Sequence, residues 1–208
     1  MTPPATPRLS TRKQPQQRRS AAVVTAILQA AAQVLAAQGA ARFTTARVAE
    51  RAGISIGSLY QYFPNKAAIL FRLQSDEWRD TRAMLAALLA DTSLPPPARL
   101  RAAVQAFVAS ECAEAAMRQA LEDAAPLYRD APEARAAQSE GLGAVVAFLR
   151  EALPQADAER LAIAAEVMVG ALKAQGKSLS QSGKTPQAIA MHSAAIADML
   201  CAYMAALG

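Results

Sequence analysis

Few residues in this sequence have the types and spacing that catalysis requires, whereas cationic side chains are abundant and unevenly placed. A single histidine and two distant cysteines, Cys112 and Cys201, leave little from which to build a nucleophile, an acid–base pair or a metal site. Residues 1–66 hold nine Lys or Arg and one acid, Glu50, while the other 142 residues hold 13 basic and 16 acidic side chains. We expect no enzyme, cofactor or metal, and a nucleic-acid-binding N-terminal part joined to a part that binds something else.

The most informative stretch is FTTARVAERAGISIGSLYQYFPNKAAIL, which begins at Phe43 and ends at Leu70. Thr44 is a good helix N-cap, and Phe43 before it can pack on Val48 as a hydrophobic staple. Gly53 permits the sharp turn between two short helices. This pattern predicts a helix-turn-helix.

The second short helix of this motif is predicted to begin at Ser55, which can cap it. Leu59 and Phe63, four residues apart, would anchor the helix to a core. The first turn would then carry Ile56, Gly57 and Ser58, where a recognition helix meets base edges in the major groove. Asn65 can cap the next helix, which places Lys66 at a helix N-terminus that favours phosphate.

This ordered set of residues resembles the DNA-binding domain of the TetR family of bacterial transcriptional repressors. The matching residues are Thr44, Thr45, Val48, Ala49, Ala52, Gly53, Gly57, Leu59, Tyr60, Tyr62, Phe63, Asn65 and Lys66. The resemblance covers about residues 18–71, and the rest of the chain matches only in length and helical character. One departure is Ala67, where many family members carry an acid.

The resemblance implies roles for individual side chains in DNA binding. Phosphate contacts fall on Thr44, Thr45, Tyr62 and Lys66. Base-facing positions are Arg47, Ile56, Gly57, Ser58 and Tyr60, with Ser55 at the start of the same helix. Arg47 is the candidate for a bidentate guanine contact; its alternative is a solvated helix face, and that of Tyr60 is a partly buried core ring. Arg8, Arg12, Lys13, Arg18 and Arg19 are either a minor-groove arm or a solvated basic tail.

The whole chain is predicted to be all-α, because 53% of it is hydrophobic, only 5% is aromatic, and alanine, the best helix former, is its commonest residue. Proline and glycine divide it into expected helices at about 18–37, 44–51, 55–61, 65–90, 97–123, 132–152, 156–177 and 186–207. We expect a basic tail with the composition of disorder at 1–17, a three-helix DNA-binding domain at 18–64, and a helical effector-binding and dimerisation domain at 65–208.

A single helix-turn-helix contacts few bases, so the resemblance implies a homodimer on a palindromic operator. Family members pair through a four-helix bundle of their last two helices. The apolar stripes of those helices predict an interface made of Leu161, Met168, Leu172, Ile189, Ile196, Met199, Leu200 and Tyr203. The alternative is that these stripes are buried within one subunit. His192 and Cys201 lie near the second stripe and are interpreted as packing residues.

The resemblance also implies a small-molecule effector that binds inside the C-terminal domain and shifts the protein between DNA-competent and incompetent states. Apolar and aromatic residues typical of such sites, with one acid, are Trp78, Phe107, Met117, Tyr128, Phe148 and Glu166. The alternative for each apolar residue in this set is a plain core position, and the alternative for Glu166 is a solvated side chain. The sequence does not identify the effector, the operator or the regulated genes.

Three other interpretations bear on this sequence. The uncharged stretch Ser20 to Ala41 is long enough to span a membrane, but Thr25, Gln29 and Gln33 put a polar stripe on one helical face. We therefore expect a cytoplasmic protein. The segment Ala171 to Ser178 loosely matches a nucleotide-binding loop, but a helix rather than a strand is expected before it. A nucleoid-type DNA binder without an effector stays open.

Overall fold

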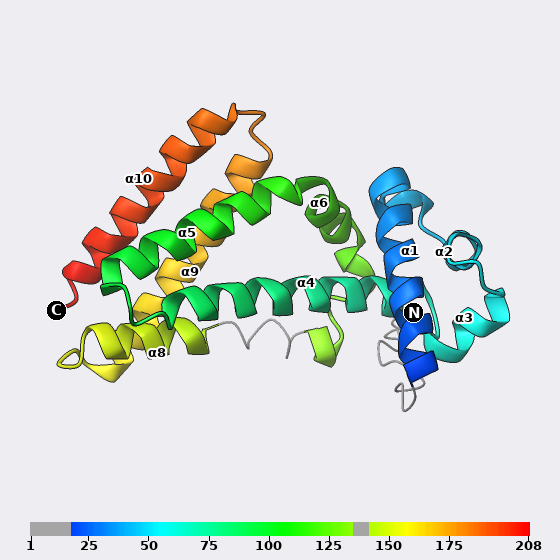
Figure 1. Cartoon of the computed structure of the whole chain (residues 1–208), viewed down its shortest axis with the longest axis horizontal. Helices are drawn as coiled ribbons and strands as arrows, with labels where there is room; N and C mark the ends of the chain where they lie inside the picture. The colour runs from blue at the N-terminus through cyan, green and yellow to red at the C-terminus, as the bar shows by residue number, and fades with distance from the viewer. Residues whose placement is uncertain (1–17, 135–141) are drawn as a thin grey trace, which may run out of the picture. The chain divides into compact units, whose positions relative to one another are not determined.

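The computed structural model describes residues 18–134 and 142–208, and these residues form helices without strands. The helices are shown in Figure 1. They are α1 (Arg18–Arg42), α2 (Thr45–Arg51), α3 (Ile56–Tyr62), α4 (Lys66–Leu89), α5 (Pro96–Ala113), α6 (Ala115–Ala124), the short 3-10 helix η1 (Ala125–Leu127), α8 (Gly143–Ala152), α9 (Ala158–Ser180) and α10 (Pro186–Ala205). The all-α prediction is confirmed.

The helix boundaries lie close to those expected from proline, glycine and capping residues, with one break that was not expected. The helix predicted at about 97–123 is interrupted at Glu114, which separates α5 from α6. The helix expected at 132–152 lies partly outside the described residues; the part that can be compared is α8. Within α1, Gly39 has a φ of 71°, so the regular helix ends where a glycine cap was expected.

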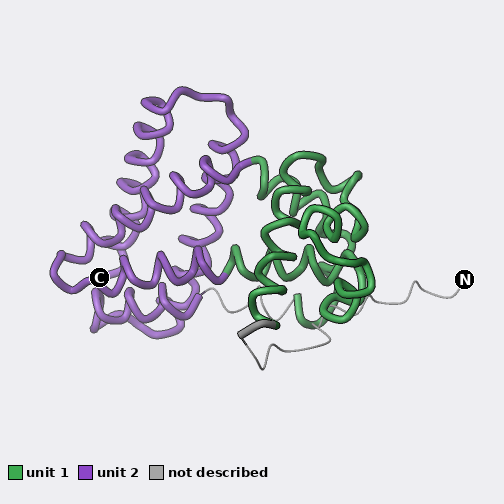
Figure 2. The backbone as a smooth tube through the Cα atoms, turned by 45° about the vertical axis from the view of Figure 1, so that its right-hand side comes forward, with its two compact units in different colours: residues 1–78, 116–138 green, residues 79–115, 139–208 purple. Residues whose placement is uncertain are grey.

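The chain divides into two compact units, drawn in different colours in Figure 2. The first contains residues 1–78 and 116–138, and the second contains residues 79–115 and 139–208. This division differs from the domain boundary expected at residue 65. The reason is that the first turns of α4, together with α6, share a core with α1–α3.

The core of the first unit is formed around α1. Ile27, Ala31 and Leu35 are fully buried on one face of that helix. They lie in one cluster with Phe43 and Leu59, which come from the helix-turn-helix. Burial of a side chain of this size stabilises the fold by about 1.5–3 kcal/mol.

Two described helices, Ser20–Arg42 and Pro186–Ala205, are long and apolar enough to cross a membrane by length and composition alone. The apolar face of the first helix lies in the core just described. A residue of its polar stripe, Gln33, makes a hydrogen bond to α2. Arg51 Nε donates a hydrogen bond of 2.7 Å to Gln33 Oε1, which joins α2 to α1. These contacts are those of a helix packed in a protein core.

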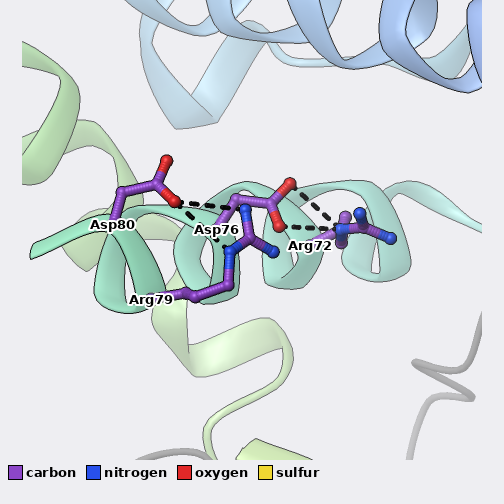
Figure 3. Close-up of polar contacts among 4 residues, drawn as sticks. All are labelled: Arg72, Asp76, Arg79 and Asp80. Carbon is purple, nitrogen blue, oxygen red and sulfur yellow. Dashed lines mark hydrogen bonds and ion pairs between the residues drawn. The ribbon is translucent and has the colours of Figure 1, made fainter. Parts of the chain in front are cut away.

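The surface of α4 carries ion pairs along the helix, shown in Figure 3. Arg72 Nε lies 3.0 Å from both carboxylate oxygens of Asp76, one turn further on. Arg79 Nη2 lies 3.2 Å from Asp80 Oδ1. A pair one turn apart, such as Arg72 with Asp76, stabilises a helix by only about 0.2–0.5 kcal/mol. These ion pairs make α4, which contributes residues to both units, a charged helix on its solvent side.

The second unit is organised around a buried arginine, Arg99, whose side chain is 2% exposed. Its guanidinium donates to both carboxylate oxygens of Glu151, at 2.6 and 3.0 Å, and to the carbonyl oxygen of Leu89, at 2.9 Å. It also lies over the ring of Phe148, 5.3 Å from its centroid. These hydrogen bonds hold the pKa of the Glu151 carboxyl below its ordinary value. Arg99 therefore joins the end of α4, the start of α5 and α8.

Helix α9 packs on α5 through a glycine. A Cβ atom placed on Gly176 would lie 2.7 Å from Phe107 Cε1 and 3.1 Å from Glu111 Cγ. The absence of a side chain at Gly176 therefore sets how closely the two helices approach. Gly176 and the two residues after it lie inside α9, which ends at Ser180. The loose match to a nucleotide-binding loop thus falls within a regular helix rather than a phosphate-binding turn.

Replacing Gly176 with alanine should lower the free energy of unfolding by about 1–3 kcal/mol, because the added methyl group overpacks the contact with Phe107. Chemical denaturation at a fixed protein concentration measures the change. Gly143→Ala is the matched control, since a Cβ there meets nothing within 4 Å. Equal stability of the two variants would contradict the proposed close contact.

Candidate nucleic-acid interface

The helix-turn-helix begins with the capping interactions expected from the sequence. Thr44 Oγ1 accepts a hydrogen bond of 3.3 Å from the backbone N–H of Arg47. Phe43 and Val48 are both fully buried in the same cluster, consistent with the expected staple. The N-cap prediction for Thr44 is confirmed, and α2 starts one residue later.

The turn between α2 and α3 depends on Gly53, whose φ of 67° is left-handed. The backbone N–H of Gly53 donates to the carbonyl of Glu50 at 3.1 Å, and that of Ile54 donates to the carbonyl of Ala49 at 3.0 Å. These bonds close the turn over the end of α2. A residue with a side chain at position 53 would be strained.

Helix α3 is capped by Ser55, as predicted. Its hydroxyl accepts a hydrogen bond of 3.0 Å from the backbone N–H of Ser58 and lies 2.8 Å from the hydroxyl of Ser58. Leu59 is fully buried and Phe63 is almost fully buried, so they anchor α3 to the core of the first unit. The opposite face of α3 is exposed, with Ile56 42% and Tyr60 40% accessible.

A hydrogen bond between hydroxyl groups links α3 to α2. Tyr60 Oη lies 3.0 Å from Thr45 Oγ1. The side chain of Tyr60 is therefore exposed but fixed by a hydrogen bond. The sequence had suggested either a base contact or a partly buried ring, and neither included this bond. The hydrogen bond orients the recognition helix relative to the helix before it.

Arg47 uses its guanidinium within the protein. Its Nη1 donates a hydrogen bond of 2.6 Å to the carbonyl oxygen of Arg42, at the end of α1. A guanine contact by Arg47 must therefore either be compatible with this bond or replace it. Arg51 was not among the predicted site residues. Its side chain donates a hydrogen bond to Gln33 of α1.

The start of α4 has the expected cap. Asn65 Oδ1 accepts a hydrogen bond of 2.9 Å from the backbone N–H of Ala68. Lys66 is the first residue of α4 and is exposed. Ala67, which stands where many family members carry an acid, is buried in the core of the first unit. The ammonium of Lys66 is accessible at a helix N-terminus, where anions are favoured.

The sequence comparisons identify both parts of the chain. Residues 27–73 match the family of bacterial regulatory proteins named after TetR, and residues 95–207 match the tetracyclin repressor-like C-terminal domain. The second match alone covers more than half of the chain. This protein belongs to the TetR family. It is a DNA-binding transcriptional regulator, as the helix-turn-helix resemblance implied. No curated protein sequence matches the chain.

Solved structures of TetR-family regulators share this fold at low sequence identity. A regulator from Mesorhizobium loti is 16% identical with a TM-score of 0.72, over 90% of this chain and 98% of that one. FadR from Bacillus subtilis, in complex with stearoyl-CoA, is 17% identical with a TM-score of 0.64, over 85% and 97%. LfrR from Mycobacterium smegmatis, in complex with proflavine, is 22% identical with a TM-score of 0.59, over 88% and 96%.

The six residues expected to line an effector site are divided between the two units. Trp78, Met117 and Tyr128 belong to the first unit, whereas Phe107, Phe148 and Glu166 belong to the second. Phe148 lies against Arg99, and Phe107 lies against Gly176, so both have structural roles. Glu166 is exposed on α9, as its alternative interpretation has it.

A buried polar cluster on α4 and α6 was not found from the sequence. Arg118 Nη1 lies 2.8 Å from Glu77 Oε1, Gln74 Nε2 donates to Glu77 Oε2 at 3.0 Å, and both ionic side chains are mostly buried. Tyr128 donates to the carbonyl of Leu121 at 3.1 Å and to Gln74 at 3.4 Å. Burial raises the pKa of the Tyr128 phenol. The partners are up to 54 residues apart, so no local pattern reveals them.

The residues expected at the dimer interface mostly lie in the core of one chain. Leu161, Met168, Ile196 and Leu200 are buried there, and Leu172, Ile189 and Tyr203 pack partly against the same core. Met199 alone among the eight is an exposed large apolar residue. Seven of the eight thus lie on the inward faces of α9 and α10, as the alternative interpretation has it, and the residues that pair two subunits stay a prediction. Both helices are apolar on two faces, so periodicity cannot tell which face is inward.

Of the five basic residues considered as an arm, Arg8, Arg12 and Lys13 lie outside the described residues. Arg18 and Arg19 are the first two residues of α1.

The two residues interpreted as packing residues near the second stripe lie on α10. Cys201 Sγ contacts the carbonyl of Pro97 at 3.6 Å, and burial raises the pKa of its thiol. His192 Nδ1 lies 2.7 Å from the carbonyl of Ala188, one turn earlier on α10, and its side chain is exposed.

Replacing Lys66 with alanine should weaken binding to all DNA sequences and lower the slope of log affinity against log salt by about one unit, because one phosphate contact is lost. Titrations at several salt concentrations measure the slope. Lys184→Ala, at an exposed lysine before α10, is the control and should leave the slope unchanged. An unchanged slope for Lys66→Ala would refute its phosphate role.

Proposed function

We propose that this protein is a homodimeric repressor, acting in the cytoplasm, that binds a palindromic operator and is released from it by a small-molecule effector. It acts by binding alone, without catalysis. The observation that carries the proposal is the exposed face of α3, held by Gly53, Ser55 and the link from Thr45 to Tyr60, with Lys66 accessible at the start of α4. Membership of a family of regulators supports it.

In this proposal the exposed residues of the first unit divide by role. Thr44, Thr45, Tyr62 and Lys66 contact phosphates and set the register on the duplex. Arg47, Ser55, Ile56, Gly57, Ser58 and Tyr60 face the bases. The excess of basic residues in positions 1–66 favours association with a polyanion.

A second copy of the chain is proposed to cover the outward faces of α9 and α10. Four of the large apolar residues exposed on the described surface lie on these two helices: Ile163 at 54%, Val167 at 51%, Met191 at 68% and Met199 at 49%. Ile163 and Val167 are four residues apart, and Met191 and Met199 are eight apart, so each pair lies on one face of its helix. Of the interface residues predicted from the sequence, Met199 also lies on this outward face.

The effector is proposed on the basis of the family and of the ligand complexes of its members. Stearoyl-CoA in FadR and proflavine in LfrR differ in charge and shape. They therefore support a ligand-responsive regulator without indicating the chemical class of the ligand for this chain. Trp78, Met117 and Tyr128 remain candidate contacts in the first unit, and Phe107 and Phe148 in the second.

The experiment that tests the operator proposal is footprinting of the purified protein on DNA from its own gene neighbourhood, at several salt concentrations. A protected site with two-fold symmetry is the expected result, because a symmetric dimer presents two identical recognition helices. Protection without sequence preference would favour a nucleoid-type protein instead. Absence of binding at low salt would contradict DNA binding by the protein as purified.

Replacing Val167 with glutamate should raise the dissociation constant of the dimer by about a thousandfold or more, because a carboxylate would be buried in each half of the interface. Sedimentation equilibrium measures the change, and circular dichroism checks that the helices are intact. Leu94→Glu, a similarly exposed apolar residue outside α9 and α10, should leave the dimer unchanged. A stable dimer of the Val167 variant would refute the proposed interface.

A further inference from the structure

The outward face of α3 presents a large side chain that has no polar atom. Ile56 is 42% exposed in the first turn of the helix. Tyr60, four residues later, lies on the same face and is exposed to a similar extent. Leu59 and Phe63 already fill the inward face, so Ile56 is not needed for the core.

The polar groups around Ile56 are hydrogen-bonded within the protein. The hydroxyls of Ser55 and Ser58 lie 2.8 Å apart, and Ser55 also accepts from the helix backbone. Tyr60 Oη is paired with Thr45, and Arg47 Nη1 donates to a backbone carbonyl. These groups are therefore already oriented by bonds within the protein, whereas Ile56 offers an exposed apolar surface that needs no hydrogen-bond partner.

The residue next to Ile56 leaves space for close approach to DNA. Gly57 has no side chain, and a Cβ placed there would meet only Ser55 Oγ, at 3.8 Å. The backbone of the first turn can therefore approach the floor of the major groove. At that depth an apolar side chain can contact one apolar group of the bases, the 5-methyl group of thymine.

We propose that Ile56 reads a thymine in each operator half-site by packing against its 5-methyl group. This inference rests on the proposed function, since it assumes that α3 enters the major groove of a specific operator. It adds the identity of the base and the chemistry by which it is recognised. Specificity at that base pair then depends on shape and desolvation of a methyl group rather than on hydrogen bonds.

The test uses the full-length protein and the operator defined by footprinting. Each thymine of one half-site is replaced in turn by deoxyuridine, which lacks only the methyl group and keeps the base-pairing edge. We expect one position at which wild-type affinity falls about fourfold, the equivalent of burying one methyl-sized group. Substituting both half-sites should give about the square of that factor, since distant sites are additive.

The variants connect this methyl effect to one side chain. With Ile56→Ala, thymine and deoxyuridine operators should bind equally at that position, and Ile56→Val should retain part of the difference. Leu94→Ala removes a similarly exposed apolar side chain elsewhere and should keep the full wild-type difference. Exchanging the T·A pair for C·G should weaken binding, and 5-methylcytosine should recover the contribution of the methyl group.

Two results would overturn the inference while leaving operator binding intact. One is that every deoxyuridine substitution is neutral in the wild-type protein. The other is that the methyl effect persists unchanged in both Ile56 variants. Failure of the proposed function gives a different result, namely the absence of a specific protected site before any base is modified. In that case the inference fails together with the proposed function.

Discussion

The unpaired backbone N–H groups at the start of each helix are the constraint on which this structure depends. An all-helical chain has many helix starts, and a seven-residue helix such as α2 or α3 is not stable alone. Side-chain oxygens satisfy these groups at five helix starts: Thr44, Ser55, Asn65, Asp157 and Thr185. Each cap contributes about 1 kcal/mol and also determines where its helix begins. In the first unit these positions decide which residues α2 and α3 expose.

The two units satisfy buried charge in similar ways. In the second unit Arg99 is bound by Glu151 and a helix-terminal carbonyl, which joins three helices. In the first unit Arg118 pairs with Glu77 and joins α6 to α4. Removing Glu151 or Glu77 would leave a largely buried arginine without its carboxylate, which is strongly destabilising. The helices α1–α3 of the DNA-binding domain are thus supported by α4 and α6, which share their core.

The sequence was sufficient to predict whatever is determined locally. The caps at Thr44, Ser55 and Asn65, the turn at Gly53 and the end of α1 at Gly39 depend on residues within one turn of each other, and all are found. The fold class and the family followed from these. Features that depend on distant partners were not predictable. Which face of α9 and of α10 is buried depends on the helices that pack against them. Tyr128 is hydrogen-bonded to Gln74, which lies 54 positions away in the sequence.

The side chains around Met191 and Met199 on the outward face of α10 are mostly alanines, including Ala194, Ala195 and Ala202, all exposed. An alanine has no rotamers, so covering it with another surface costs no side-chain entropy, whereas immobilising a lysine or glutamine costs up to about 2 kcal/mol. Methionine, although flexible, adapts its shape to irregular neighbours. Each residue of such a surface contributes little contact free energy, but little side-chain entropy is lost when the surface is covered. In the proposed dimer, the strength of association would therefore depend on how many small contacts fit together rather than on a single anchor.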